Sequence, residues 1–150
     1  MATKTKLPPN PLLTEVLELV SKQRSKAKKI EVLQEYDTDA LRAILIWNYE
    51  AVSMLPEGAV PYKPNESPKG TAHQQLSQEY KRLYHFVRGG NDALKPLRRE
   101  SMFIQLLEGL HEDEAALLVK VKDSRLEDLY KVNLNIIKEA YPDIKWGWRK

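Results

Sequence analysis

The feature that most constrains the fold is segment 40–52, ALRAILIWNYEAV, whose apolar residues would cover almost every face of a helix. A helix that is apolar nearly all round is surrounded by other elements. The preceding residues, Asp37-Thr38-Asp39, form a strong N-terminal cap. The apolar positions are Leu41, Ile44, Leu45, Trp47 and Val52. The segment therefore predicts the central helix of a helical domain.

Further apolar stripes at helical spacing lie on both sides of this segment, and cap signals separate them. Asn10-Pro11 and Pro96 are typical helix starts, and Gly89-Gly90 is a typical helix end. Two capping boxes, Thr71 with Gln74 and Ser124 with Glu127, predict two more starts. A break near Ser25 divides the first stripe from the next, and no segment shows the alternation of a strand.

The pattern predicts an all-α fold: a single compact domain of about six or seven helices over residues 10–150, preceded by a flexible basic arm at 1–9. The predicted core consists of Leu17, Ile44, Leu45, Trp47, Leu83, Phe103, Leu106, Leu107, Leu118 and Ile137. Residues 55–70 hold four of the nine prolines and two of the six glycines, so they predict a long loop. We expect it to lie over the helices, held by Leu55, Val60 and Tyr62; an extended recognition segment at 61–64 is the alternative.

Composition excludes several classes of function. The chain has no cysteine, which rules out disulfides, Fe–S clusters and thiol catalysis and agrees with a reducing cytosol. No apolar run approaches the roughly 20 residues that cross a bilayer, and no apolar secretory signal is seen. Neither a phosphate-binding loop nor a dinucleotide-binding turn is present. We therefore expect a cytosolic protein without a cofactor and without a membrane partner.

The most catalytic-looking residues are His111 and the carboxylates around it. A helical zinc site needs a second histidine four residues on, where the chain has Ala115, and no second Glu-x-x-His pair supports a dimetal site. Acidic residues also suit the first turn of a helix. The pattern favours a polar turn between two helices, and a lone Mg²⁺ or Mn²⁺ site is the alternative. The carboxylates are Glu108, Glu112, Asp113 and Glu114.

Charge is distributed in bands. Residues 81–99 hold six cations and one anion, a net of +5, whereas residues 100–128 hold eight anions and three cations, a net of −5. The two bands either neutralise each other when packed or leave a basic surface for nucleic acid. The nucleic-acid candidates are Lys81, Arg82, Tyr84, His85, Arg88, Lys95, Arg98 and Arg99. Residues 21–29 form another basic stretch.

The C-terminal segment DIKWGWRK is rich in tryptophan. Trp and Arg are favoured as anchors of protein interfaces, so Trp146, Trp148 and Arg149 are the candidate protein-binding residues. The alternative is that Trp146 packs on the core.

Four segments together resemble an uncharacterised family of small helical proteins of T-even-type tailed phages, especially cyanophage-like myoviruses. They are KIEVLQEYDTDALRAILIWNY, LPEGAVPYKPNESPKG, RRESMFIQLLEGLHEDEAALLVKVKD and EAYPDIKWG. The likeness runs from about residue 12 to 147. It implies a phage protein made in the host bacterial cytoplasm, with virion association possible, and it carries over no catalytic residue.

These observations predict a non-enzymatic adaptor that binds a phage or host protein. The alternative is a nucleic-acid-binding accessory protein of phage replication or transcription. A virion structural component and a metal-dependent hydrolase are the remaining alternatives, and the oligomeric state is open.

Overall fold

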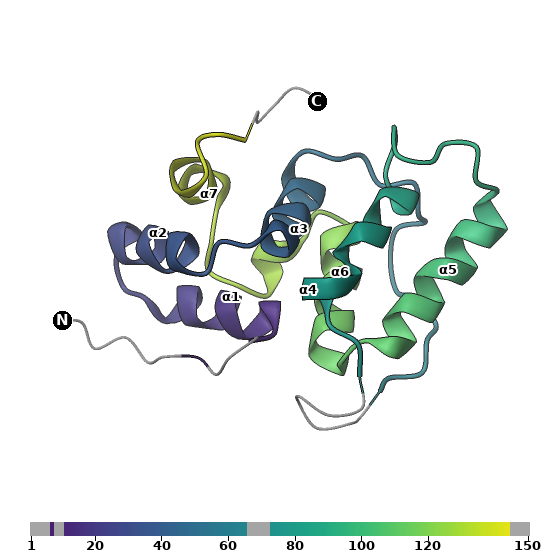
Figure 1. The fold of residues 1–150 in the computed structure, drawn as a ribbon, viewed down its shortest axis with the longest axis horizontal. Helices are drawn as coiled ribbons and strands as arrows, with labels where there is room; N and C mark the ends of the chain where they lie inside the picture. The colour runs from purple at the N-terminus through teal and green to yellow at the C-terminus, as the bar shows by residue number, and fades with distance from the viewer. Residues whose placement is uncertain (1–6, 8–10, 66–72, 145–150) are drawn as a thin grey trace.

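Helix α3 (Asp39–Tyr49) lies in the middle of the fold, as its all-round apolar pattern predicts (Figure 1). The structure is a computed structural model that describes residue 7 and residues 11–65 and 73–144. The predicted cap is confirmed, since the Thr38 hydroxyl accepts the Leu41 N–H at 3.1 Å. Asn48 is a buried polar residue of this helix, and its Oδ1 accepts a hydrogen bond from the Leu126 N–H at 3.0 Å.

The other helices form two groups on either side of α3 (Figure 1), and α4, η1 and α6 pack directly against it. The described residues contain seven α-helices, two 3₁₀ helices and no strand, so the predicted all-α fold is confirmed. At one end, α1 packs on α2 and α2 on α7; at the other, α4, η1 and α5 surround α6 and α3. The remaining bounds are α1 Leu13–Lys22, α2 Lys26–Glu35, α4 Leu76–Glu79, η1 Tyr80–Phe86, α5 Pro96–Gly109, α6 Glu112–Lys122, η2 Leu126–Asp128 and α7 Leu134–Ala140.

All ten predicted core residues are buried. The centre of the core is aromatic: the ring of Trp47 lies 6.1 Å from those of Phe86 and Phe103, which are 5.2 Å apart. Edge-to-face and offset aromatic pairs of this kind add to the stability gained by apolar burial. No helix in the described residues is long and apolar enough to span a membrane.

Two predicted helices are shorter than their capping patterns indicated. Residue 71 lies outside the described residues, and Gln74 does not take the third helical position, because its N–H binds the Gly109 carbonyl at 2.7 Å. The helix starts at Leu76 and soon tightens into the 3₁₀ helix η1. Ser124 has a φ of 61° and starts no α-helix; η2 follows, and α7 is capped by Asn133. Tertiary contacts decide these boundaries over the local pattern.

The proline-rich segment lies over α5 and α6, as predicted, where the structure describes it. Leu55, Val60 and Tyr62 pack against the core. Glu108 accepts the Lys63 N–H at 2.9 Å, and Lys122 Nζ donates to the Pro56 carbonyl at 2.7 Å. These bonds fix an extended backbone that has few partners of its own.

Candidate functional site

The carboxylates around His111 point to different partners and form no shared site. His111 caps α6, with its Nδ1 accepting the Asp113 N–H at 3.0 Å, and its ring lies edge-on to that of His73 at 5.2 Å. The Glu108 carboxylate accepts the backbone N–H of Lys63 in the proline-rich loop, as described above. In residues 11–65 and 73–144, no three His, Asp or Glu side chains lie close enough to hold a metal ion. The arrangement matches the predicted polar turn between helices.

Glu114 was predicted as an ordinary first-turn acid, but it is fully buried. Its two carboxylate oxygens accept the N–H groups of Leu13 and Leu76, each at 2.9 Å. Burial raises the pKa of Glu114, and the two N–H donors act against that rise. One carboxylate thus satisfies the backbone at the starts of α1 and α4, which it holds close together. Its role is structural.

The basic segment 81–99 spreads over η1, the turn after it and the start of α5. Five of its six cations are exposed, and Tyr84 is 50% exposed. The acidic residues that follow have partners elsewhere: Glu108 binds the loop, Glu114 is buried, and Glu127 accepts the Tyr49 hydroxyl at 2.8 Å. These three acids are therefore engaged away from the basic surface. The exposed cations are Lys81, Arg82, Arg88, Lys95 and Arg98.

Arg99 is the exception, and its prediction as a nucleic-acid contact is wrong. It is only 2% exposed. Its Nε donates to the His85 carbonyl at 2.9 Å, and its Nη2 donates to the carbonyls of Asn91 and Leu94 at 3.0 and 2.9 Å. Arg99 therefore holds together η1 and the turn that leads into α5, because the guanidinium can serve several acceptors in one plane.

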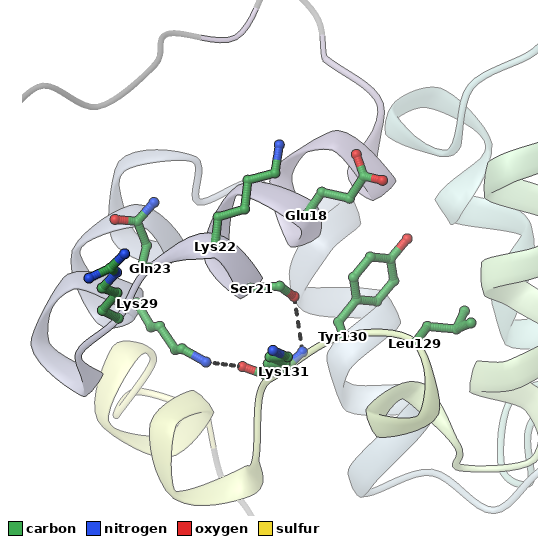
Figure 2. A pocket seen from close by; sticks show the side chains of 9 residues that line it. Glu18, Ser21, Lys22, Gln23, Lys29, Leu129, Tyr130 and Lys131 are labelled. Atoms are coloured by element: carbon green, nitrogen blue, oxygen red, sulfur yellow. Dashed lines mark hydrogen bonds between the residues drawn. The ribbon is translucent and has the colours of Figure 1, made fainter.

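Two basic concavities stand out on this fold. The smaller is a pocket of about 260 Å³ between η1 and α5, and it brings together Arg82, His85 and Arg98. The larger is an open hollow of about 860 Å³ between the α1–α2 corner and residues 129–131 (Figure 2). The hollow is lined by Glu18, Ser21, Lys22, Gln23, Arg24, Lys29, Leu129, Tyr130 and Lys131.

The walls of the hollow are joined by side-chain bonds to the backbone (Figure 2). The Lys29 ammonium donates to the Lys131 carbonyl, and Ser21 Oγ accepts the Lys131 N–H at 2.9 Å. Burial, with help from Glu18, raises the pKa of Tyr130, whose hydroxyl therefore stays protonated as a donor. The hollow offers ammonium, guanidinium and hydroxyl donors, with the side chain of Leu129 and the ring of Tyr130 at one side.

Sequence reasoning identified the basic stretch 21–29 but not the hollow. The stretch carries five cations and no anion. Residues 129–131, which form the opposite wall, are about a hundred positions away, so the two walls meet only through tertiary packing, including that of α7 on α2. The predicted anchors Trp146, Trp148 and Arg149 lie outside the described residues.

Comparison with known proteins identifies a family. No curated protein and no solved structure matches the chain significantly. Residues 16–128 match a family described as "Family of unknown function (DUF6433)". That description states neither an activity nor a source, so the phage context stays a prediction. The matched region runs from α1 to η2 and covers most of the helical domain. The chain belongs to the DUF6433 family.

Proposed function

We propose that the protein is a non-enzymatic adaptor whose basic hollow binds an acidic segment of another protein. The observation that carries this proposal is the lining of the hollow: Lys22, Arg24, Lys29 and Lys131 face a single acid, Glu18. Within the described residues, Lys22, Arg24 and the Lys131 ammonium have no ion-pair partner. A surface of one charge sign attracts a partner of the other sign and speeds its association.

The shape of the hollow supports a peptide as the bound group. It is wide and open, and Leu129 at its edge is 43% exposed. Acidic side chains of a partner would meet the cations, while an apolar side chain would contact Leu129 and the ring of Tyr130. Protein interfaces combine apolar contacts with hydrogen bonds and charged groups in this way.

The partner's identity follows only from the phage resemblance. On that basis we propose a phage or host protein, met in the host bacterial cytoplasm or in the virion. Trp146, Trp148 and Arg149 would extend the interface as anchors. Removing residues 145–150 tests them without breaking the Arg42–Asp143 ion pair, whose atoms are 2.7 Å apart. Unchanged binding after this truncation would exclude the tail as an anchor.

The test of the hollow is a titration with a labelled peptide of alternating glutamate and leucine, followed by fluorescence anisotropy. The pair Lys22→Glu and Lys131→Glu should abolish binding, because it reverses charge on both walls of the hollow. The matched control, Lys81→Glu with Lys95→Glu, makes the same charge change at the other end and should weaken binding only slightly. An equal loss of peptide affinity in the two double variants would refute the hollow as the binding site. So would the absence of peptide binding by the unaltered protein.

A further inference from the structure

The pocket between η1 and α5 is lined by groups that bind anions. Its polar lining consists of two guanidiniums, one imidazole and one amide, and it includes no carboxylate. Its floor is apolar, with Phe86 and Leu106 both buried. The lining residues are Arg82, His85, Phe86, Arg98, Met102, Gln105 and Leu106.

Helices η1 and α5 have different numbers of residues per turn, and each places its pocket residues along one side. A 3₁₀ helix has three residues per turn, so Arg82 and His85 lie on one edge of η1. In α5, positions 98, 102 and 105 fall on one face of the α-helix. The edge of η1 and this face of α5 line the same pocket.

His85 is held in place from two directions before any ligand binds. Its carbonyl accepts the Arg99 Nε–H at 2.9 Å, and its ring Nδ1 lies 2.9 Å from the Asn91 amide nitrogen. With the amide donating to Nδ1, the ring proton resides on Nε2, so the imidazole can donate to an anion. A donor that is already positioned loses little entropy when a ligand binds.

Arg82 and Arg98 differ in their ion-pair partners. Arg82 Nε lies 3.3 Å from Glu79 Oε1, which orients its guanidinium through one edge only. Within residues 11–65 and 73–144, Arg98 has no ion-pair partner. A planar guanidinium with free N–H groups matches the oxygens of a phosphate two at a time. The pocket therefore presents two arginine forks and one imidazole donor for a single phosphate.

An exposed aromatic ring stands next to the pocket. Tyr84 is 50% exposed, and its ring centroid lies 4.0 Å from that of His85, with 34° between the ring planes. An exposed ring beside a phosphate site offers a surface on which an unpaired base can stack. The cations Lys81, Arg88 and Lys95 are exposed on the same elements and the turn between them, where they can follow further phosphates.

We propose that this pocket is a phosphate site for single-stranded nucleic acid, with one phosphate held by Arg82, His85 and Arg98 and the adjoining base stacked on Tyr84. Single-stranded binding sites combine a basic surface with aromatic stacking in this way. The site is separate from the hollow of the proposed function, shares no residue with it, and is tested with a different probe.

The experiment is a titration of the full chain with a fluorescently labelled oligothymidine strand at low and moderate salt. Binding should weaken as salt rises, because phosphate contacts release counterions. Arg98→Gln and Arg82→Gln should each weaken binding about tenfold, the effect of losing one charge-assisted contact. Tyr84→Ala should weaken it about as much by removing the stacking surface. All three side chains are exposed, so the variants should fold.

The matched control is Lys81→Gln, which removes the same charge from the residue beside Arg82 without touching the pocket. It should weaken binding less than Arg82→Gln does. Equal losses for Lys81→Gln and Arg82→Gln would show a diffuse electrostatic contact and overturn the pocket. Equal affinity for a duplex of the same sequence would overturn stacking. The nucleic-acid site would be overturned if oligothymidine did not bind at low salt, or if the glutamate–leucine peptide displaced it completely. Neither outcome bears on the adaptor proposal, which the peptide titration tests separately.

Discussion

The two basic concavities differ in the kind of cation that they use. The hollow is wide and has three lysines and one arginine, whereas the pocket is about a third of its volume and has two arginines and a histidine. Ammonium groups on long flexible stems adapt to many partners, while guanidiniums fit planar or tetrahedral oxyanions in defined geometry. Two regions with similar net charge therefore suit different ligands.

A second contrast concerns neighbours in sequence. Arg98 is exposed at the pocket, but Arg99 is buried and binds three backbone carbonyls. One guanidinium is available to a ligand because the next one holds the backbone around it. A charged residue is assigned to binding or to structure by its burial and its partners, and counts of charge do not distinguish the two.

The largest effect on stability should come from Glu114, which joins the start of α1, the helix that lines the hollow, to the start of α4, which precedes η1. Glu114→Ala leaves the N–H groups of Leu13 and Leu76 buried without an acceptor. We expect the free energy of unfolding to fall by about 3 kcal/mol, since each such group costs roughly 1–3 kcal/mol. Urea denaturation measures it. Glu112→Ala, in the same turn but exposed, is the control and should change stability by under about 0.5 kcal/mol.

The next effect should distinguish Arg99 from Arg98. Arg99→Ala removes three bonds to buried or partly buried carbonyls and should cost about 2 kcal/mol of unfolding free energy. Arg98→Ala should stay within about 0.5 kcal/mol, as exposed substitutions do. Hydrogen exchange should accelerate in residues 85–95 only for the Arg99 variant. Equal thermal stability of both variants would contradict the structural role of Arg99.

A smaller effect should appear at the hollow. Ser21→Ala removes the hydroxyl that accepts the Lys131 N–H at 2.9 Å and should cost about 1 kcal/mol. It should also weaken binding of the glutamate–leucine peptide without changing the oligothymidine affinity. Ser101→Ala on the exposed face of α5 is the matched control and should leave both unchanged. Loss of both affinities in the Ser21 variant would show that the two sites are coupled.

The smallest effect should be a dependence of stability on pH. Burial raises the folded-state pKa of Glu114 above its ordinary 4.5. The native state then binds more protons than the unfolded state, so this contribution to stability is complete below that value and is lost as pH rises through the folded pKa. Compared with Glu114→Gln, which cannot titrate, the unaltered protein should lose more stability as the pH rises above 4.5. Parallel curves from urea denaturation would contradict the raised pKa.

The sequence by itself determined the helical class, the central position of α3 and the buried apolar residues. Those features depend on local periodicity and on helix-start residues such as Thr38 and Pro96, both of which take the predicted role. Apolar burial is also the dominant and least directional force in folding, so an apolar stripe identifies the core without knowledge of its partners.

Only the tertiary structure decided what the polar residues do. Leu13 and Leu76 are far from Glu114 in sequence, and the two walls of the hollow are about a hundred residues apart. A hydrogen bond depends on direction and on a partner within about 3 Å, and no local pattern encodes a partner brought in by helix packing. The same cause explains why η1 is a 3₁₀ helix, why Arg99 is buried, and why Arg82 and Arg98 line one pocket.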